Sequence, residues 1–236
     1  MGETGRASPC SRAGAELREL LMAACGPRQG VDVAGVAPAE RFAPWPPELR
    51  PETLLAGARS VVVLGCEIFR APAARAEVAQ CEARGYRDLY DRHNRQAIAA
   101  LGQAVERACS LLSAQGHAAV NVQQEVGNPS HPPRFSFKAA AVAAGVGVMG
   151  KNGLVLHPRF GSRIRLAAVI TTAALPADPL LAGDPCSGCD ACVRACPSGA
   201  LREPGPGQRV NHDPFACYAY YVASGGCGRC MAACPR

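Results

Sequence analysis

The sequence has few aromatic residues and no apolar run of membrane-spanning length. Aromatic residues make up 5% of the 236 residues, which leaves little of the stacking surface that proteins use to bind single-stranded nucleic acid. Residues 1–14 lack the apolar segment of a secretory signal peptide. The longest uncharged apolar run, residues 139–149, is shorter than the ~20 residues of a transmembrane helix. We therefore expect a cytoplasmic protein with no membrane partner.

Cysteine, in contrast, is abundant, and eight of the 13 cysteines lie within residues 186–236. The first block reads Cys186-Ser-Gly-Cys189-Asp-Ala-Cys192-Val-Arg-Ala-Cys196-Pro197. This C-x2-C-x2-C-x3-C-P spacing is typical of bacterial two-cluster ferredoxins, in which three cysteines bind one cluster and the fourth binds the other. Pro197 ends the helical turn that leads to the fourth cysteine. The first block therefore predicts a second block and a second cluster.

The second block, Cys227-Gly-Arg-Cys230-Met-Ala-Ala-Cys234-Pro235, is one ligand short. Ser224 stands where the full spacing would place its first cysteine. The nearest unassigned thiol is Cys217, seven residues earlier. Eight thiolates satisfy two [4Fe-4S] cubanes. We assign cluster I to Cys186, Cys189, Cys192 and Cys234, and cluster II to Cys196, Cys217, Cys227 and Cys230.

Zinc binding and disulfide formation are the alternative uses of these cysteines. A structural zinc site closes with four ligands from two C-x2-C pairs and does not need a third cysteine or a C-x3-C-P step. Disulfides need an oxidising compartment, and nothing in the N-terminal residues indicates export. Iron–sulfur clusters therefore explain the spacing best. The remaining thiols are irregularly spaced and are expected to be small buried or surface residues: Cys10, Cys25, Cys66, Cys81 and Cys109.

The net charge is small once the clusters are included. The formal charge of the chain is +6, and each cluster with its four thiolates carries about −2, so the loaded protein should carry about +2. Such a charge gives no argument for nucleic-acid binding by itself.

The first three quarters of the chain alternates between helix and strand patterns. Apolar residues at helical spacing predict a helix over residues 13–25, and the β-branched run over residues 60–65 predicts a central buried strand. Further strands are expected over 31–36, 118–122, 154–156 and 163–172, and further helices over 73–113, with a break at Gly85-Tyr86, and over 135–144. This interleaving favours an α/β (α+β) body over residues 1–178. A two-cluster ferredoxin-like unit follows over residues 179–236.

The glycine-rich segment Gly145-Val-Gly147-Val-Met-Gly150 matches G-x-G-x-x-G. In dinucleotide-binding folds this motif follows a strand and opens a helix, and an acidic residue comes about 20 residues later. Here a helix precedes the glycines, a strand follows them, and no Asp or Glu occurs between Gly150 and Asp178. Lys151-Asn152 also lacks the hydroxyl residue of a P-loop. We therefore expect no dinucleotide or P-loop site.

Residues 138–175, together with the cysteine blocks, resemble the epoxyqueuosine reductase family and its corrinoid-dependent relatives, including reductive dehalogenases. Cys217 matches an isolated family cysteine between the two blocks. The resemblance is carried by Ala144-Gly-Val-Gly-Val-Met-Gly-Lys-Asn-Gly-Leu-Val-Leu156, Pro158-Arg-Phe-Gly-Ser162, Ile170-Thr-Thr-Ala-Ala-Leu175 and the first cysteine block.

The resemblance implies a cobalamin held between the α/β body and the two-cluster unit, with electrons passing through both clusters to the corrinoid. We expect its pocket to be bordered by residues 127–134 and 145–152. Glycines there would allow close backbone approach, and Lys151 can meet a phosphate, a carboxylate or an amide oxygen. A tight helix-to-strand turn explains the glycines equally well. The candidate cofactor-binding residues are Gly145, Gly147, Gly150, Lys151 and Asn152.

His131 is the candidate catalytic residue. Ungapped counting back from Gly145 places it where the family has an aspartate that is its proposed proton donor. A histidine can donate a proton near neutral pH. A histidine in a proline-rich loop is, however, more often a polar loop residue without a catalytic role.

Three functions fit the sequence. The first is an oxidoreductase that uses the two clusters and a corrinoid to reduce a small molecule or a corrinoid protein. The second is an electron-transfer module for a partner enzyme, and the third is epoxyqueuosine reduction on tRNA. The large body favours the first over the second, because a simple ferredoxin needs only the cluster segment. We expect a flavodoxin or ferredoxin as electron donor. We expect tRNA to be an unlikely partner, because aromatic content is low and no segment follows the clusters where the family engages tRNA.

Overall fold

The computed structural model describes residues 9–27, 29–68, 83–122, 129–130 and 134–236. Its body is built on one four-stranded sheet with the strand order β1-β2-β6-β3. Every neighbouring pair in this sheet is antiparallel. The strands are β1 (Val33–Pro38), β2 (Ser60–Glu67), β3 (Ala119–Val122) and β6 (Ile164–Thr171).

Strand β2 lies inside the sheet because its side chains are buried on both faces. All of its residues are buried. Val62 and Leu64 belong to one hydrophobic cluster, and Val61 and Val63 belong to the other. Alternate residues of a strand point to opposite faces, so an uninterrupted apolar run requires cover on both sides.

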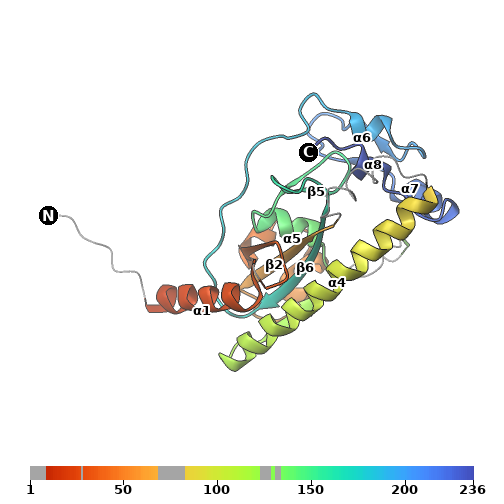
Figure 1. Cartoon of the computed structure of the whole chain (residues 1–236). Coiled ribbons are helices and arrows are strands. Elements are labelled where there is room, and N and C mark those ends of the chain that lie inside the picture. The colour runs from red at the N-terminus through yellow and green to blue at the C-terminus, as the bar shows by residue number, and fades with distance from the viewer. Residues whose placement is uncertain (1–8, 28, 69–82, 123–128, 131–133) are drawn as a thin grey trace.

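Helices cover both faces of the sheet, as Figure 1 shows. On one face Leu21 of α1 and Leu101 and Val105 of the long helix α4 pack against the strands. On the other face the alanines of α5 pack together with Phe42 and Phe135. The helices of the body are α1 (Pro9–Cys25), η1 (Ala39–Phe42), η2 (Pro47–Leu49), α2 (Pro51–Leu54), α4 (Ala83–Ala114) and α5 (Phe137–Ala143).

The linker over residues 172–185 runs from the end of β6 back along the body to the cysteine-rich unit (Figure 1). Asp178 attaches it to the sheet edge. Its backbone N–H donates to Val36 O at 2.9 Å, and its carboxylate accepts from Val36 N at 2.8 Å. The same carboxylate pairs with Arg18 at 2.7 Å. Arg41 donates to the backbone oxygens of Asp178 and Ala143. The edge strand β1 is therefore covered by the linker, which satisfies an edge that would otherwise be open to another chain.

The cysteine-rich unit packs against the body. Met231 and Ala232 of α8 contact the same hydrophobic cluster as α1 and α4. Helices α6 and α8, which carry Cys192 and Cys230, contact each other. The elements of the unit are α6 (Ala191–Arg194), the hairpin β7 (Leu201–Arg202) and β8 (Asn211–His212), α7 (Pro214–Ala223) and α8 (Arg229–Ala232).

The mixed helix and strand body predicted from the sequence is confirmed. The break predicted at Gly85-Tyr86 is wrong, because α4 continues through both residues; one glycine inside a helix costs only about 1 kcal/mol. Pro38 is the last residue of β1, an edge strand in which a missing N–H is tolerated. Within the described ranges, no helix is long and apolar enough to cross a membrane.

Candidate metal centre

The first cysteine block folds into a turn followed by a single helical turn. Asp184 accepts a hydrogen bond from Cys186 N at 2.9 Å, and Cys189 N donates to Cys186 O at 3.1 Å. The short helix α6 then carries Cys192, and Cys196 follows after its end. The sequence thus turns three thiols toward one point and takes the fourth away from it, as the C-x2-C-x2-C-x3-C spacing predicts.

Ser224, which stands where the full spacing would place a cysteine, lies at the end of α7 (Pro214–Ala223). Asp213 caps α7 by accepting from Phe215 N and Ala216 N, each at 3.0 Å. At the other end of α7 the Ser224 hydroxyl lies 2.7 Å from Tyr220 O and 2.9 Å from Gly226 O. Ser224 therefore closes the helix, while Cys217 lies inside α7.

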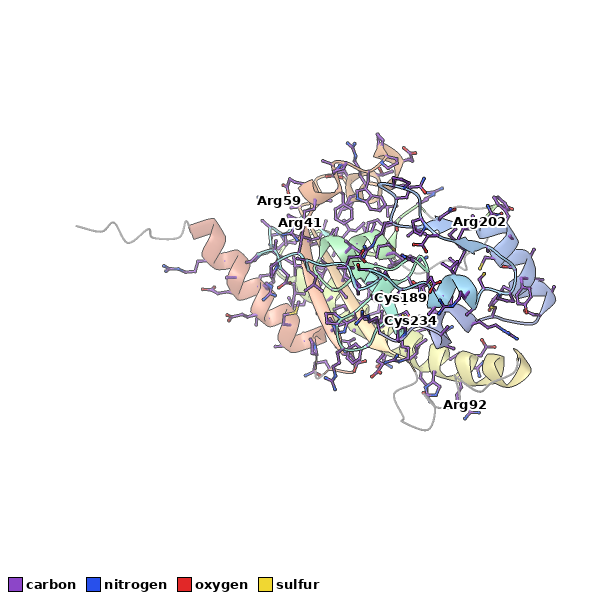
Figure 2. All side chains as sticks on the ribbon, turned by 90° about the horizontal axis from the view of Figure 1, so that it is seen from above. Arg41, Arg59, Arg92, Cys189, Arg202 and Cys234 are labelled. Carbon is purple, nitrogen blue, oxygen red and sulfur yellow. The ribbon has the colours of Figure 1, made fainter. Side chains whose placement is uncertain are left out.

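Four of the eight cysteines line one cavity between the body and the cysteine-rich unit. The body contributes Lys151, Asn152 and Leu156 to the lining. Figure 2 shows Cys189 and Cys234 close together at this place, although they are far apart in sequence. The cysteines around the cavity are Cys186, Cys189, Cys192 and Cys234.

The other four thiols lie near one another. Burial raises the pKa of Cys217, and the neighbouring Cys227 and Cys196 raise it further. Burial raises the pKa of Cys230 to about 12, with further contributions from Cys227, Cys217, Cys192 and Cys196. Thiolates held this close repel each other unless cations lie between them. Iron ions supply that charge, so the donor set fits a metal cluster.

Backbone N–H groups form hydrogen bonds to one thiol in each group, Cys196 and Cys186. Burial opposes ionisation of Cys196, but the Ser198 hydroxyl and the backbone N–H groups of Leu201, Ser198 and Ala200 outweigh it and lower its pKa. The Lys151 backbone N–H donates to Cys186 Sγ at 3.5 Å. Hydrogen bonds to sulfur are one of the features that set the potential of an iron–sulfur cluster. In the described residues, no three His, Cys, Asp or Glu side chains are close enough to hold a single metal ion.

Two ion pairs lie near the first group of cysteines. Lys151 Nζ pairs with Glu203, and Arg209 pairs with Asp184 at 2.7 Å. Arg209 Nε also donates to Met149 O in β4 (Val148–Met149), which pairs with β5 (Val155–Leu156). The Lys151–Glu203 pair and the bond from Arg209 to Met149 join the body to the cysteine-rich unit. The sequence offered no signal for them, because charged residues this far apart meet only through the tertiary fold.

The three glycines predicted to approach a cofactor pack against the protein itself. Gly145 has φ +67°, and a Cβ there would lie 2.0 Å from Pro179 O in the linker. A Cβ on Gly147 would meet Val155 and Leu156, and one on Gly150 would meet Asn152 and Leu156. The glycines therefore allow a tight helix-to-hairpin turn and close approach of the linker. They give no separate argument for a cofactor.

The other two candidates of this stretch lie at the cavity lined by the first group of cysteines. Lys151 and Asn152 both contribute to its lining. The Asn152 side chain accepts from Leu154 N at 3.1 Å and so stabilises the turn. His131, the candidate proton donor, lies outside the described residues.

Buried polar atoms without a partner occur near the start of β6. Ser162 is 3% exposed, and its hydroxyl has no hydrogen-bond partner among the residues that the structure describes. The same holds for the buried side-chain oxygen of Asn94 in α4. A buried unsatisfied hydroxyl or amide costs about 1–3 kcal/mol. A polar ligand in contact with either atom would remove its cost, so both atoms are compatible with a polar cofactor.

Comparison with known proteins supports the metal centre. Residues 185–236 match the family model described as a 4Fe-4S dicluster domain. The epoxyqueuosine reductase of Synechococcus sp. (strain RCC307) is 35% identical over 112 residues, which cover 42% of this chain and 33% of that protein. The tetrachloroethene reductive dehalogenase of Sulfurospirillum multivorans is 37% identical over 114 residues, covering 41% of this chain and 23% of that protein. The matched segments thus span a third or less of these relatives.

Solved structures share the fold over nearly the whole chain. A reductive dehalogenase whose structure suggests a mechanism for B12-dependent dehalogenation aligns with a TM-score of 0.68 at 18% identity, covering 100% of this chain and 33% of that chain. An epoxyqueuosine reductase with an epoxyqueuosine-modified tRNA stem loop aligns with a TM-score of 0.63 at 21% identity, covering 93% and 64%. The resemblance predicted from the sequence and the C-terminal dicluster domain are therefore confirmed.

The comparisons correct one expectation. Low aromatic content and small net charge argued that tRNA is an unlikely partner. A structural neighbour has been solved with a tRNA stem loop at 21% identity, and relatives at 35% and 31% identity are named epoxyqueuosine reductases. Composition alone therefore does not exclude tRNA, because a few side chains placed by the fold can recognise RNA.

Proposed function

We propose that the chain is an oxidoreductase that binds two [4Fe-4S] clusters and uses them to reduce a substrate with the help of a corrinoid. Two groups of four cysteines, one around a cavity and one around Cys230, carry this proposal. The first group holds cluster I and the second holds cluster II, as the spacing predicts. When bound, the clusters supply one-electron transfer.

The protein's own residues hold and shield the proposed clusters. Cluster I is bordered by Leu156 of the hairpin and by the ion pairs of Lys151 and Arg209. Cluster II is bordered by α7, by Cys196 with its backbone N–H donors, and by Met231 of α8. Their surroundings differ in hydrogen bonding and charge, and both features set cluster potentials. The two clusters should therefore titrate at different potentials.

We place the corrinoid at the end of the body that faces the clusters. The unpartnered Ser162 hydroxyl and Asn94 oxygen support this position, because a corrinoid has amide side chains that donate and accept hydrogen bonds. The similarity to a structure described for B12-dependent dehalogenation adds to that support. When bound, a corrinoid would supply a reducing centre that side chains lack. His131 remains the proposed proton donor.

The boundary between the two proposed units is Asp178, with the body over residues 1–178 and the two-cluster unit over 179–236. Asp178 bonds to β1, and the next residue, Pro179, packs on Gly145. Electrons have to reach the clusters from outside, and we propose a small electron-transfer protein such as a flavodoxin or ferredoxin as donor.

The substrate separates two versions of the proposal. The similarity to epoxyqueuosine reductases favours the epoxide of epoxyqueuosine in tRNA, and the similarity to the tetrachloroethene reductive dehalogenase favours a halogenated small molecule. Turnover of each substrate by the reduced, cobalamin-supplemented protein decides between them. A pure electron-transfer module would turn over neither substrate and would bind no cobalamin.

The test of the function is anaerobic reconstitution followed by titration with cobalamin. The loaded chain should contain close to eight iron and eight sulfide, because eight thiolates fill two cubanes. Added cobalamin should then change its absorption spectrum saturably, and Ser162→Ala should weaken this binding without loss of iron. Bound zinc, or a wild-type spectrum that does not saturate with cobalamin, would contradict the proposal.

A further inference from the structure

The two lysines of the chain lie beside the two groups of cysteines. The sequence has 25 lysines and arginines, and only Lys138 and Lys151 are lysines. Lys151 lines the cavity of the first group, and its charge acts on Cys186. Lys138 in α5 acts on Cys217 and Cys230 of the second group. Lysine carries a compact point charge on a flexible stem, whereas arginine spreads its charge over a planar fork.

Lys151 is built into the wall of the cluster I site. Its backbone N–H donates to Cys186 Sγ at 3.5 Å, and its ammonium pairs with Glu203. The Lys151 side chain is 15% exposed, whereas that of Glu203 is 59% exposed. Neighbouring residues therefore cover most of the Lys151 side chain beside the cysteines, and Glu203, on the more exposed side, holds its ammonium.

A cation in that position changes the balance between the two redox states of cluster I. Reduction adds one negative charge to the cluster, and a nearby positive charge stabilises the reduced state more than the oxidised state. A nearby carboxylate has the opposite effect. Both effects weaken with distance and with screening by water and salt, so the charges that line the cluster I cavity act most strongly on it.

We propose that Lys151, balanced by Glu203, sets the reduction potential of cluster I. The proposal rests on the cluster assignment above and deepens it. Lys151 lies beside cluster I and changes its potential, but it neither gives nor takes the electron. The positive charge of Lys151 raises the reduction potential of cluster I, and the negative charge of Glu203 lowers it.

Lys138 provides a comparison at cluster II. Burial lowers the pKa of its ammonium, and the thiols of Cys217 and Cys230 act in the opposite direction. Among the described residues it makes no ion pair, so no carboxylate offsets its charge there. Its removal should therefore lower the potential of cluster II, whose thiols it faces, and leave that of cluster I unchanged.

The test is a redox titration of the reconstituted full chain followed by electron paramagnetic resonance. Lys151→Gln should lower the ratio of reduced to oxidised cluster I at a fixed potential on the order of tenfold, which is ~59 mV for a one-electron couple. Glu203→Gln should raise this ratio, and the double variant should return toward the wild-type value. Lys151→Arg keeps the charge and should restore most of the potential.

Arg202→Gln is the matched control. Arg202 lies next to Glu203 in the same unit and is exposed, and Figure 2 shows it apart from Cys189 and Cys234. Arg202→Gln removes the same formal charge as Lys151→Gln, but the cluster I potential should stay at the wild-type value. Lys138→Gln should leave cluster I unchanged and move only cluster II.

The outcomes separate this inference from the proposed function. Eight iron in wild type and in Lys151→Gln, with cluster I potentials equal to each other, overturns the role of Lys151 and leaves the function standing. A wild-type chain without two clusters overturns both. If Lys151→Gln does not load iron, Glu203→Gln decides, because the exposed glutamate can be changed without disturbing the fold; an unshifted potential in that variant also overturns the role of the pair.

Discussion

Removal of the Asp178 carboxylate should loosen the attachment between the linker and the body by a predictable amount. In wild type this carboxylate accepts from the buried Val36 N–H at 2.8 Å and from Arg18 at 2.7 Å. Asp178→Ala leaves the Val36 N–H without an acceptor, which costs about 1–3 kcal/mol. The ion pair adds only about 0–1 kcal/mol, because both side chains are roughly 30% exposed. The midpoints of these two ranges add to about 2.5 kcal/mol, so we expect a total loss of about 2–3 kcal/mol.

Hydrogen exchange measured by mass spectrometry gives this loss locally. The exchange of the peptide that contains Val36 should accelerate roughly 30- to 150-fold in Asp178→Ala, because each ~1.4 kcal/mol is a factor of ten. Arg18→Gln removes the ion pair and keeps the Val36 bond, so its exchange should change less than about fivefold. Equal acceleration in both variants would refute the reasoning, since the effect would then come from the exposed charge pair.

Three further predictions test other parts of the structure. Cys217→Ser should bind about half the wild-type iron, whereas Cys109→Ser, which lies outside both groups, should bind all of it; equal iron content by elemental analysis would send cluster II to another ligand. Gly145→Ala should lower the unfolding midpoint in urea by more than Gly116→Ala, because both have positive φ but only Gly145 meets a carbonyl at 2.0 Å; equal midpoints would contradict the close packing of the linker. Ser162→Ala should be neutral or slightly stabilising in the absence of cobalamin, because it removes an unpartnered buried hydroxyl, and a loss above ~1 kcal/mol in thermal unfolding would show that the hydroxyl has a partner.

The features that can be predicted from the sequence depend on short-range spacing. The C-x2-C-x2-C-x3-C-P run specifies which thiols turn together, because a single turn and a single helical turn carry all four. The run of valines from Val61 to Val63 likewise needs cover on both faces wherever the strand lies. The spacing cannot show that Ser224 closes α7, because its hydroxyl is used by Tyr220 and Gly226 after the helix has formed.

The features that the sequence could not supply depend on distant contacts. The glycine at position 145 suggested a cofactor, but the atom that excludes a side chain there belongs to Pro179 in the linker. Nothing in the sequence distinguishes Asp178 from other linker residues, because its role depends on the contact with β1. The unpartnered hydroxyl of Ser162 becomes informative only when burial is known. Burial and long-range pairing therefore carry the information that local patterns lack.

The measurement that tests the account most directly is anomalous X-ray scattering at the iron and zinc absorption edges from crystals grown without oxygen. The account predicts two separate four-iron centres, one within bonding distance of Cys186, Cys189, Cys192 and Cys234 and the other within bonding distance of Cys196, Cys217, Cys227 and Cys230. A single iron centre, or a zinc signal at either group of cysteines, would contradict it.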